Sequence, residues 1–275
     1  ANLIQYVVQV VTLGLSRPAS LLFLYLLGFY ILLLSLKVDY RISAVGAIAF
    51  AFSSYFFIII EAGHMTKALA IAFMPMVVAA VLYTFRGKML LGGVLTALTV
   101  ALQIYANHLQ ITYYLVLMLL IIGLVHFVKE FKANNLVDFF KRVGVLLIAA
   151  LLASATDFTN LATTMEYGEY STRGTSELTA NLDNKTSGLD KDYATSWSYG
   201  IAETFTLLIP NFYGGASQGS LTTESETYQA IKRSPNAKQL IKKLPLYWGD
   251  QPFTSGPTYA GAIVIFLFVL GLFFI

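Results

Sequence analysis

Hydrophobic segments of nearly membrane-spanning length restrict the fold of this chain more than any other feature. Six such segments precede residue 159, and a seventh begins near Thr258 and still continues at Ile275. Most approach the roughly 18–20 residues that an α-helix needs to cross about 30 Å of hydrocarbon. The first six segments are residues 17–36, 42–60, 68–85, 89–106, 110–128 and 139–156. The pattern predicts an all-α integral membrane protein, a polytopic helical bundle with about seven spans.

The composition supports a membrane protein and excludes several other classes. Charged residues make up 12% of the chain, against about 25% in a typical soluble domain, and 57% of the residues are hydrophobic. The sequence contains no cysteine, so it has neither a disulfide framework nor a cysteine-ligated metal site. No basic stripe with interleaved aromatic residues is present, which argues against a nucleic-acid partner.

Basic residues favour one side of the predicted membrane. Eight of them lie in or beside alternate connections between the apolar segments, whereas the short connections of the other side have only Arg17 and Lys67 in or beside them. The eight are Lys37, Arg41, Arg86, Lys88, Lys129, Lys132, Lys141 and Arg142. Because short cytoplasmic loops are enriched in Lys and Arg, this bias places the eight in the cytoplasm. The long polar segment 159–257 then lies on the extracytoplasmic side.

The distribution of polar residues predicts three regions. Residues 1–158 hold about six transmembrane helices, preceded at 1–16 by an amphipathic helix in the outer interface, or alternatively by a re-entrant piece or the end of an upstream span. Residues 159–257 hold eighteen of the chain's charged residues and form an extracytoplasmic insertion of short elements. Its basic stretch 232–243 is expected to form a helix past Pro235 that lies on anionic lipid. Residues 258–275 begin a further transmembrane helix, so we expect a fragment of a longer chain.

The first candidate site is the outer connection that contains Glu61, His64 and Lys67. An acid, an imidazole and an ammonium fall within seven residues there, and ionisable groups at membrane depth often mark substrate paths. Lys67 is suited to holding a phosphate as a point charge, and His64 can bind phosphate or move a proton near neutral pH. The alternative is an interfacial loop in which Lys67 snorkels and His64 bonds to backbone. The density of ionisable groups favours a substrate-binding site.

The second candidate site is the next outer connection, which contains Asn107, His108 and Gln110. These side chains supply hydrogen-bond donors and acceptors at one depth, and His108 is placed to meet His64 across the bundle. Two His residues on separate loops suggest a metal, but no paired-His helix motif or carboxylate cluster supports one. A polar turn that satisfies the ends of two helices is an equally good interpretation.

The third candidate is the acidic pair Asp190 and Asp192. Two acids two residues apart can share a divalent cation that bridges a diphosphate. A solvated turn is the favoured interpretation, because so short a motif arises often by chance. No nucleophile elbow, phosphate-binding loop, dinucleotide fingerprint or His-Glu-x-x-His motif occurs, which argues against hydrolases, ATPases, dehydrogenases and zinc proteases.

Four runs of the sequence together resemble a known family. The runs are SRPASLLFLYLLGFYILL (16–33), AFAFSSYFFIIIEAGHMTKALAIAFMP (49–75), LTALTVALQIYANHLQITYYL (95–115) and GLDKDYATSWSYGIAETFTLLIPNFYGG (188–215). Their combination resembles the YfhO-like bacterial membrane proteins, in the version found in Bacteroidetes. These proteins are similar to the C-type glycosyltransferases, which carry the GT-C fold and move a sugar from a polyprenyl-phosphate donor to an acceptor.

The resemblance implies a multi-pass glycosyltransferase of the bacterial inner membrane, working at its outer face. The usual catalytic acid of such enzymes lies in the first outer loop, which is expected before Ala1. His64 and Lys67 would hold the lipid phosphate, and the connection 105–110 would face the same cavity. A divalent cation is an open question. A non-catalytic scaffold subunit of an envelope complex and a lipid or polysaccharide transporter remain the alternatives.

Overall fold

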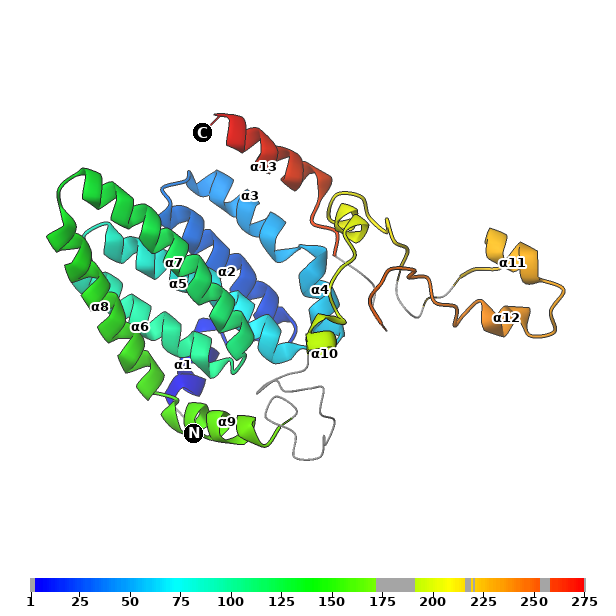
Figure 1. Ribbon diagram of the computed structural model, residues 1–275, viewed down its shortest axis with the longest axis horizontal. Helices are drawn as coiled ribbons and strands as arrows, with labels where there is room; N and C mark the ends of the chain where they lie inside the picture. Colours follow the sequence, from blue (N-terminus) through cyan, green and yellow to red (C-terminus); the bar gives the residue numbers. More distant parts are fainter. Residues whose placement is uncertain (1–2, 172–190, 216–218, 220, 253–257, 275) are drawn as a thin grey trace. The chain divides into compact units, whose positions relative to one another are not determined.

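The computed structural model describes residues 3–171, 191–215, 219, 221–252 and 258–274. By its internal contacts the chain divides into two compact units, Ala1–Thr164 and Met165–Ile275. Every regular secondary-structure element among the described residues is a helix (Figure 1). The only β-type pairing there is an isolated bridge between Gly214 and Tyr247. The predicted all-helical fold is therefore confirmed for this part of the chain.

The first unit is a bundle of helices joined mostly by short turns (Figure 1). The helices are α1 (Leu3–Val11), α2 (Ala19–Ser35), α3 (Tyr40–Ala51), α4 (Ser54–Glu61), α5 (Met65–Phe85), α6 (Met89–Tyr105), α7 (Leu109–Lys132) and α8 (Leu136–Ala155). Helix α5 packs against α2, α4, α6, α7 and α8. Of the most apolar 18 residues of α5, 78% are buried, against 11% for the corresponding stretch of α7. A helix that is apolar on all sides is suited to the centre of such a bundle.

Two buried clusters fill the bundle, one toward each end of α5. The first contains Phe73 and Ala68 with residues of α2, α4 and α6, and the Tyr25 hydroxyl donates a 2.9 Å hydrogen bond to the Ala68 carbonyl. The second surrounds Val81 and Phe85 with residues of α7 and α8. The two turns that precede α5 and follow α6 therefore adjoin the first cluster, and the turn between α5 and α6 adjoins the second.

Glycine permits close helix contacts in this bundle. A Cβ at Gly28 of α2 would lie 2.9 Å from the Ala72 carbonyl of α5, and one at Gly92 of α6 would lie 2.8 Å from the Thr84 Cα. Small residues of this kind let membrane helices approach closely, because packing rather than water exclusion drives their association. Gly28 and Gly92 therefore lie where α2 and α6 pack closely against α5.

Fewer helices reach spanning length than the sequence predicts. Among the described residues, α5 and α7 are long and apolar enough to cross a membrane, and α3 with α4 would make a third span if the bent pair counts as one. Helices α2 and α6 have 17 residues each, and α13 (Ala262–Phe274) has 13. Helix α8 has 20 residues but carries three charged residues within its first seven positions. Of the seven expected spans, the described residues therefore support two, or three with the bent pair.

The segment 42–60, predicted as one span, is instead two helices. Helices α3 and α4 meet at an angle of 41°. The break falls at Ser53, whose backbone is extended (ψ 136°), so the ladder of helical hydrogen bonds is interrupted there. The new first turn of α4 starts with a hydrogen bond from the Phe56 N–H to the Ser53 carbonyl, 3.1 Å long.

The second unit consists of short elements, as its polar composition predicts. They are α10 (Lys191–Thr195), η1 (Ala202–Leu207), α11 (Glu226–Ile231), α12 (Ala237–Leu240) and α13, while α9 (Phe158–Glu169) spans the boundary between the units. The helix expected in the stretch 232–243 shrinks to the four residues of α12. The chain around Leu246 runs beside Tyr213–Gly215, with hydrogen bonds from Gly215 N to Leu246 O and from Trp248 N to Tyr213 O.

Candidate functional site

The turn between α4 and α5 presents the first predicted residues to solvent. Glu61 is the last residue of α4 and His64 is the N-cap residue of α5, and both side chains are exposed. Gly63 makes the turn possible, because its φ of +78° lies in the left-handed region that residues with a Cβ rarely adopt. Within the described part of the chain, neither the Glu61 nor the His64 side chain forms a hydrogen bond or ion pair.

Lys67, one turn into α5, is half-buried rather than exposed. Its Nζ lies 5.3 Å from the centroid of the Tyr55 ring of α4. An ammonium over an aromatic face gains about 0.5–1 kcal/mol at an exposed site. The ring therefore holds the Lys67 ammonium near the turn.

The turn between α6 and α7 holds the second set of predicted residues. Asn107 is exposed and adopts a left-handed conformation, with φ +51°, which asparagine tolerates better than most residues. His108 is half-buried, and its carbonyl accepts hydrogen bonds from the Ile111 and Thr112 amides, which starts α7. Gln110 is exposed and its Nε2 donates to the Tyr114 hydroxyl at 2.9 Å.

Both turns lie at the same end of the bundle, which we call the His64 end. Ala68, just after the first turn, and Ala106, just before the second, belong to one buried cluster. The structure shows no hydrogen bond or ring contact between His64 and His108. The predicted meeting of the two imidazoles is therefore not seen, although the two turns share one end.

Sequence reasoning missed Gln103, which lies one helical turn before Asn107. Its side chain is completely buried, its Nε2 donates to the Thr112 hydroxyl at 3.4 Å, and its Oε1 has no hydrogen-bond partner. A buried amide oxygen without a partner is costly, more so in a bundle that excludes water. The signal was available: Thr96, Thr99 and Gln103 follow helical spacing and form a polar stripe on the buried face of α6.

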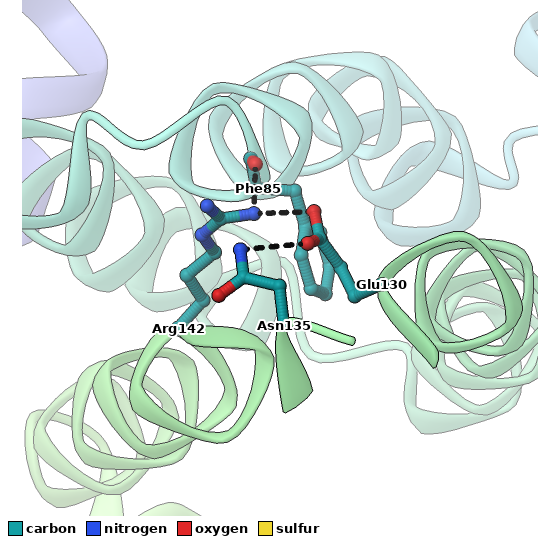
Figure 2. A network of polar contacts seen from close by, with 4 residues as sticks. All are labelled: Phe85, Glu130, Asn135 and Arg142. Atoms are coloured by element: carbon teal, nitrogen blue, oxygen red, sulfur yellow. Dashed lines mark hydrogen bonds and ion pairs between the residues drawn. The ribbon is translucent and has the colours of Figure 1, made fainter. Parts of the chain in front are cut away.

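A buried ion pair lies at the opposite end of the bundle, which we call the Arg142 end (Figure 2). One Nη of Arg142 donates both to Glu130 Oε1 at 3.0 Å and to the Phe85 carbonyl at 2.9 Å. The Asn135 amide donates to Glu130 Oε2 at 3.0 Å. The side chains of Arg142 and Glu130 are 14% and 11% exposed. From the sequence, Arg142 was expected only as a cytoplasmic cation in or beside a loop, but it joins the ends of α5 and α7 to the start of α8.

The second unit contains another buried acid, Glu203 of η1, which sequence reasoning did not select. Its Oε2 accepts from the Gly200 amide at 2.7 Å, and its Oε1 accepts from the Asp250 amide at 3.2 Å and from the Tyr247 hydroxyl. Burial, followed by the hydrogen bond to Glu203, raises the pKa of Tyr247 to about 12. The Tyr247 oxygen also accepts a hydrogen bond from the backbone N–H of Gln251 at 3.0 Å. These bonds fix two distant stretches of chain to each other.

The acidic pair proposed for a divalent cation is only half visible. Asp190 lies outside the described residues, and Asp192 is exposed in the first turn of α10. Within the described ranges, no group of three or more His, Asp or Glu side chains is placed to hold a metal ion.

No family model, curated protein or solved structure matches the chain. The resemblance to YfhO-like proteins therefore stays an expectation drawn from the four sequence runs. The geometry of the His64 end is the main guide to function.

Proposed function

We propose that this chain belongs to a bacterial inner-membrane glycosyltransferase with a GT-C-like fold, which transfers a sugar from a polyprenyl-phosphate donor to an acceptor at the outer membrane face. The observation that supports this most is the gathering of polar groups at the His64 end. Exposed Glu61 and His64 and half-buried Lys67 lie at the same end as the Asn107–Gln110 turn, with the buried Gln103 amide beneath it. Polar groups at the rim of an apolar bundle suit a ligand with a charged head and a lipid tail.

In this proposal Lys67 and His64 bind the phosphate of the donor. The ammonium of Lys67 is a point charge for a phosphate oxygen, and the Tyr55 ring limits the volume that it samples. His64, with no partner in the described structure, is available to donate a second hydrogen bond. The exposed carboxylate of Glu61 and the amides of Asn107 and Gln110 are suited to sugar hydroxyls.

The reaction is a direct displacement at the anomeric carbon. The acceptor oxygen forms a bond to that carbon while the bond from the carbon to the phosphate oxygen breaks, and a carboxylate acting as general base takes the proton of the acceptor hydroxyl. Negative charge grows on the departing phosphate. Lys67 would stabilise this charge more in the transition state than in the bound donor.

Binding of a polyprenyl phosphate to the purified protein in nanodiscs tests the proposal. We expect Lys67→Ala to weaken binding about tenfold or more, because a charged hydrogen bond contributes roughly 1.5–3 kcal/mol. The matched control is Lys88→Ala, an exposed lysine in the turn between α5 and α6 at the Arg142 end. Equal binding by both variants and the parent protein would contradict the phosphate site and favour the scaffold alternative.

A further inference from the structure

The α11–α12 hairpin of the second unit is held together by its own contacts. Ser225 caps α11, its Oγ accepting from the Tyr228 amide at 3.2 Å, and the Leu221 amide donates to the Ile241 carbonyl at 3.0 Å. Ala237 and Ile241 are buried. Helices α11 and α12 lie side by side with the turn 232–236 between them (Figure 1). The cleft between the two helices is therefore a local property of this segment.

This cleft is large enough for a polyatomic ligand and is lined mostly by polar residues. Its volume is about 260 Å³, several times the roughly 30 Å³ that a water molecule occupies in the liquid. Its lining consists of Tyr228, Lys232, Ser234, Pro235, Asn236, Ala237, Lys238 and Gln239. Two ammonium groups, two hydroxyls and two side-chain amides supply hydrogen-bond donors, and no carboxylate lines the cleft. This set of groups is suited to an anion.

The surrounding chain adds to the positive charge of the cleft. From residue 227 to residue 249 the sequence has five basic residues and no acidic one. The five are Lys232, Arg233, Lys238, Lys242 and Lys243. None of them forms an ion pair with another described residue. The Nζ of Lys232 donates a hydrogen bond to the side-chain oxygen of Gln229 at 3.0 Å. The lysines of the cleft therefore keep hydrogen-bonding capacity for a ligand.

We propose that the cleft between α11 and α12 binds a phosphate group, with Lys232 and Lys238 as its two cationic contacts. The phosphate is either the headgroup of an anionic lipid or a soluble phosphate compound, since both offer the same oxygens to the lysines. This site consists of other residues than the proposed donor site, and neither proposal depends on the other.

Lysine acylation followed by mass spectrometry tests the proposal on the unmodified full chain in nanodiscs. All four lysines of the hairpin segment are exposed, so each is available to the reagent. In neutral-lipid nanodiscs with inorganic phosphate, slower acylation of Lys232 and Lys238, but not of Lys242 and Lys243, identifies a site for soluble phosphate. The same pattern only in nanodiscs that contain phosphatidic acid identifies a lipid headgroup. Unchanged acylation of Lys232 and Lys238 under both conditions overturns the proposal.

Two charge-matched double variants separate a defined site from general attraction. Lys232→Ala with Lys238→Ala is expected to weaken phosphate or vesicle binding about tenfold or more, because two charged hydrogen bonds are lost. Lys242→Ala with Lys243→Ala removes the same charge outside the cleft and is expected to change binding less than about twofold at physiological salt. Equal losses in the two double variants would show unspecific attraction and overturn the site.

Discussion

Two buried carboxylates, one in each unit, are stabilised in different ways. Glu130 of the bundle is paired with a guanidinium at 3.0 Å and accepts one further bond from an amide side chain. Glu203 of the second unit has no cation beside it among the described residues, and accepts from two backbone amides and the Tyr247 hydroxyl. Burial of a charge is costly unless it is paired or fully hydrogen-bonded, and each acid satisfies one of these conditions.

The difference tells us where each arrangement is vulnerable. Glu130 has a single cationic partner, Arg142, so one substitution leaves a buried charge without a counter-charge. Glu203 accepts two of its hydrogen bonds from backbone amides, which most substitutions leave in place, so Glu203 itself and Tyr247 are the side chains through which this arrangement is disturbed most directly. The bundle should therefore show one large effect, and the second unit several smaller local ones.

The largest effect is expected for Arg142→Ala. The substitution leaves the Glu130 carboxylate and the Phe85 carbonyl without the guanidinium, and breaking one side of a buried pair costs about 3–5 kcal/mol. Denaturant or thermal unfolding of the purified protein in detergent measures the loss of stability.

Two controls sharpen this result. Lys141→Ala removes the neighbouring ion pair with Asp138, whose side chains are 59% and 44% exposed, and should cost less than about 0.5 kcal/mol. Glu130→Leu combined with Arg142→Met removes both charges and should recover most of the stability, because apolar replacements of a buried pair are often neutral. A double variant as unstable as Arg142→Ala would show that the loss does not come from an unpaired charge.

A smaller, local effect is expected for Glu203→Gln. The new amide keeps the shape but turns one acceptor into a donor, which then faces a backbone N–H or the Tyr247 hydroxyl, at a cost of about 1–3 kcal/mol. Hydrogen exchange should become faster in peptides covering 200–215 and 244–251. Glu224→Gln, at an exposed acid of the same unit, is the matched control and should leave exchange in these peptides unchanged.

The pH dependence of the second unit should follow Tyr247. Its pKa is raised from 10.0 to about 12, first by burial and then by the bond to Glu203, so the fold favours the protonated phenol. The resulting stability is complete below about pH 10 and is lost as the pH rises through about 12. Amide exchange between 200 and 215, measured across this range and divided by the rate of an unfolded peptide at the same pH, should quicken in the parent protein and change much less in Tyr247→Phe. Equal pH dependence in both proteins would show that another group is responsible.

The sequence predicted the helices of the bundle well because their apolar periods are long and their turns short. Five of the six apolar segments before residue 159 each became one helix within a few residues of the expected ends. The remaining segment, 42–60, is broken at Ser53, a polar residue whose effect is lost when hydropathy is averaged over a whole span. Fewer helices reach spanning length than predicted, because two helices stop at 17 residues and α8 carries its charges inside the helix rather than before it.

The polar contacts were much harder to predict, because their partners are far apart in the chain. Glu130 and Arg142 are separated by 12 residues, and Glu203 and Tyr247 by 44. Sequence reasoning selects dense local clusters, and it selected Glu61, whose side chain proved exposed. Gln103 is the exception, since the polar stripe that it shares with Thr96 could have been read from helical spacing.

The smallest effect on stability is expected for Glu61→Gln, and it completes the comparison of acids. Glu61 is exposed and forms no ion pair or hydrogen bond in the described structure, so unfolding should change by less than about 0.5 kcal/mol. The same substitution at Glu130 removes the charge that balances Arg142 and should cost several times more, about 3 kcal/mol. A Glu61→Gln protein that loses more than about 1 kcal/mol would mean that Glu61 has a structural partner. Unchanged stability together with weaker binding of a polyprenyl-phosphate sugar would instead assign this acid to the ligand, because the fold would be intact while binding is reduced.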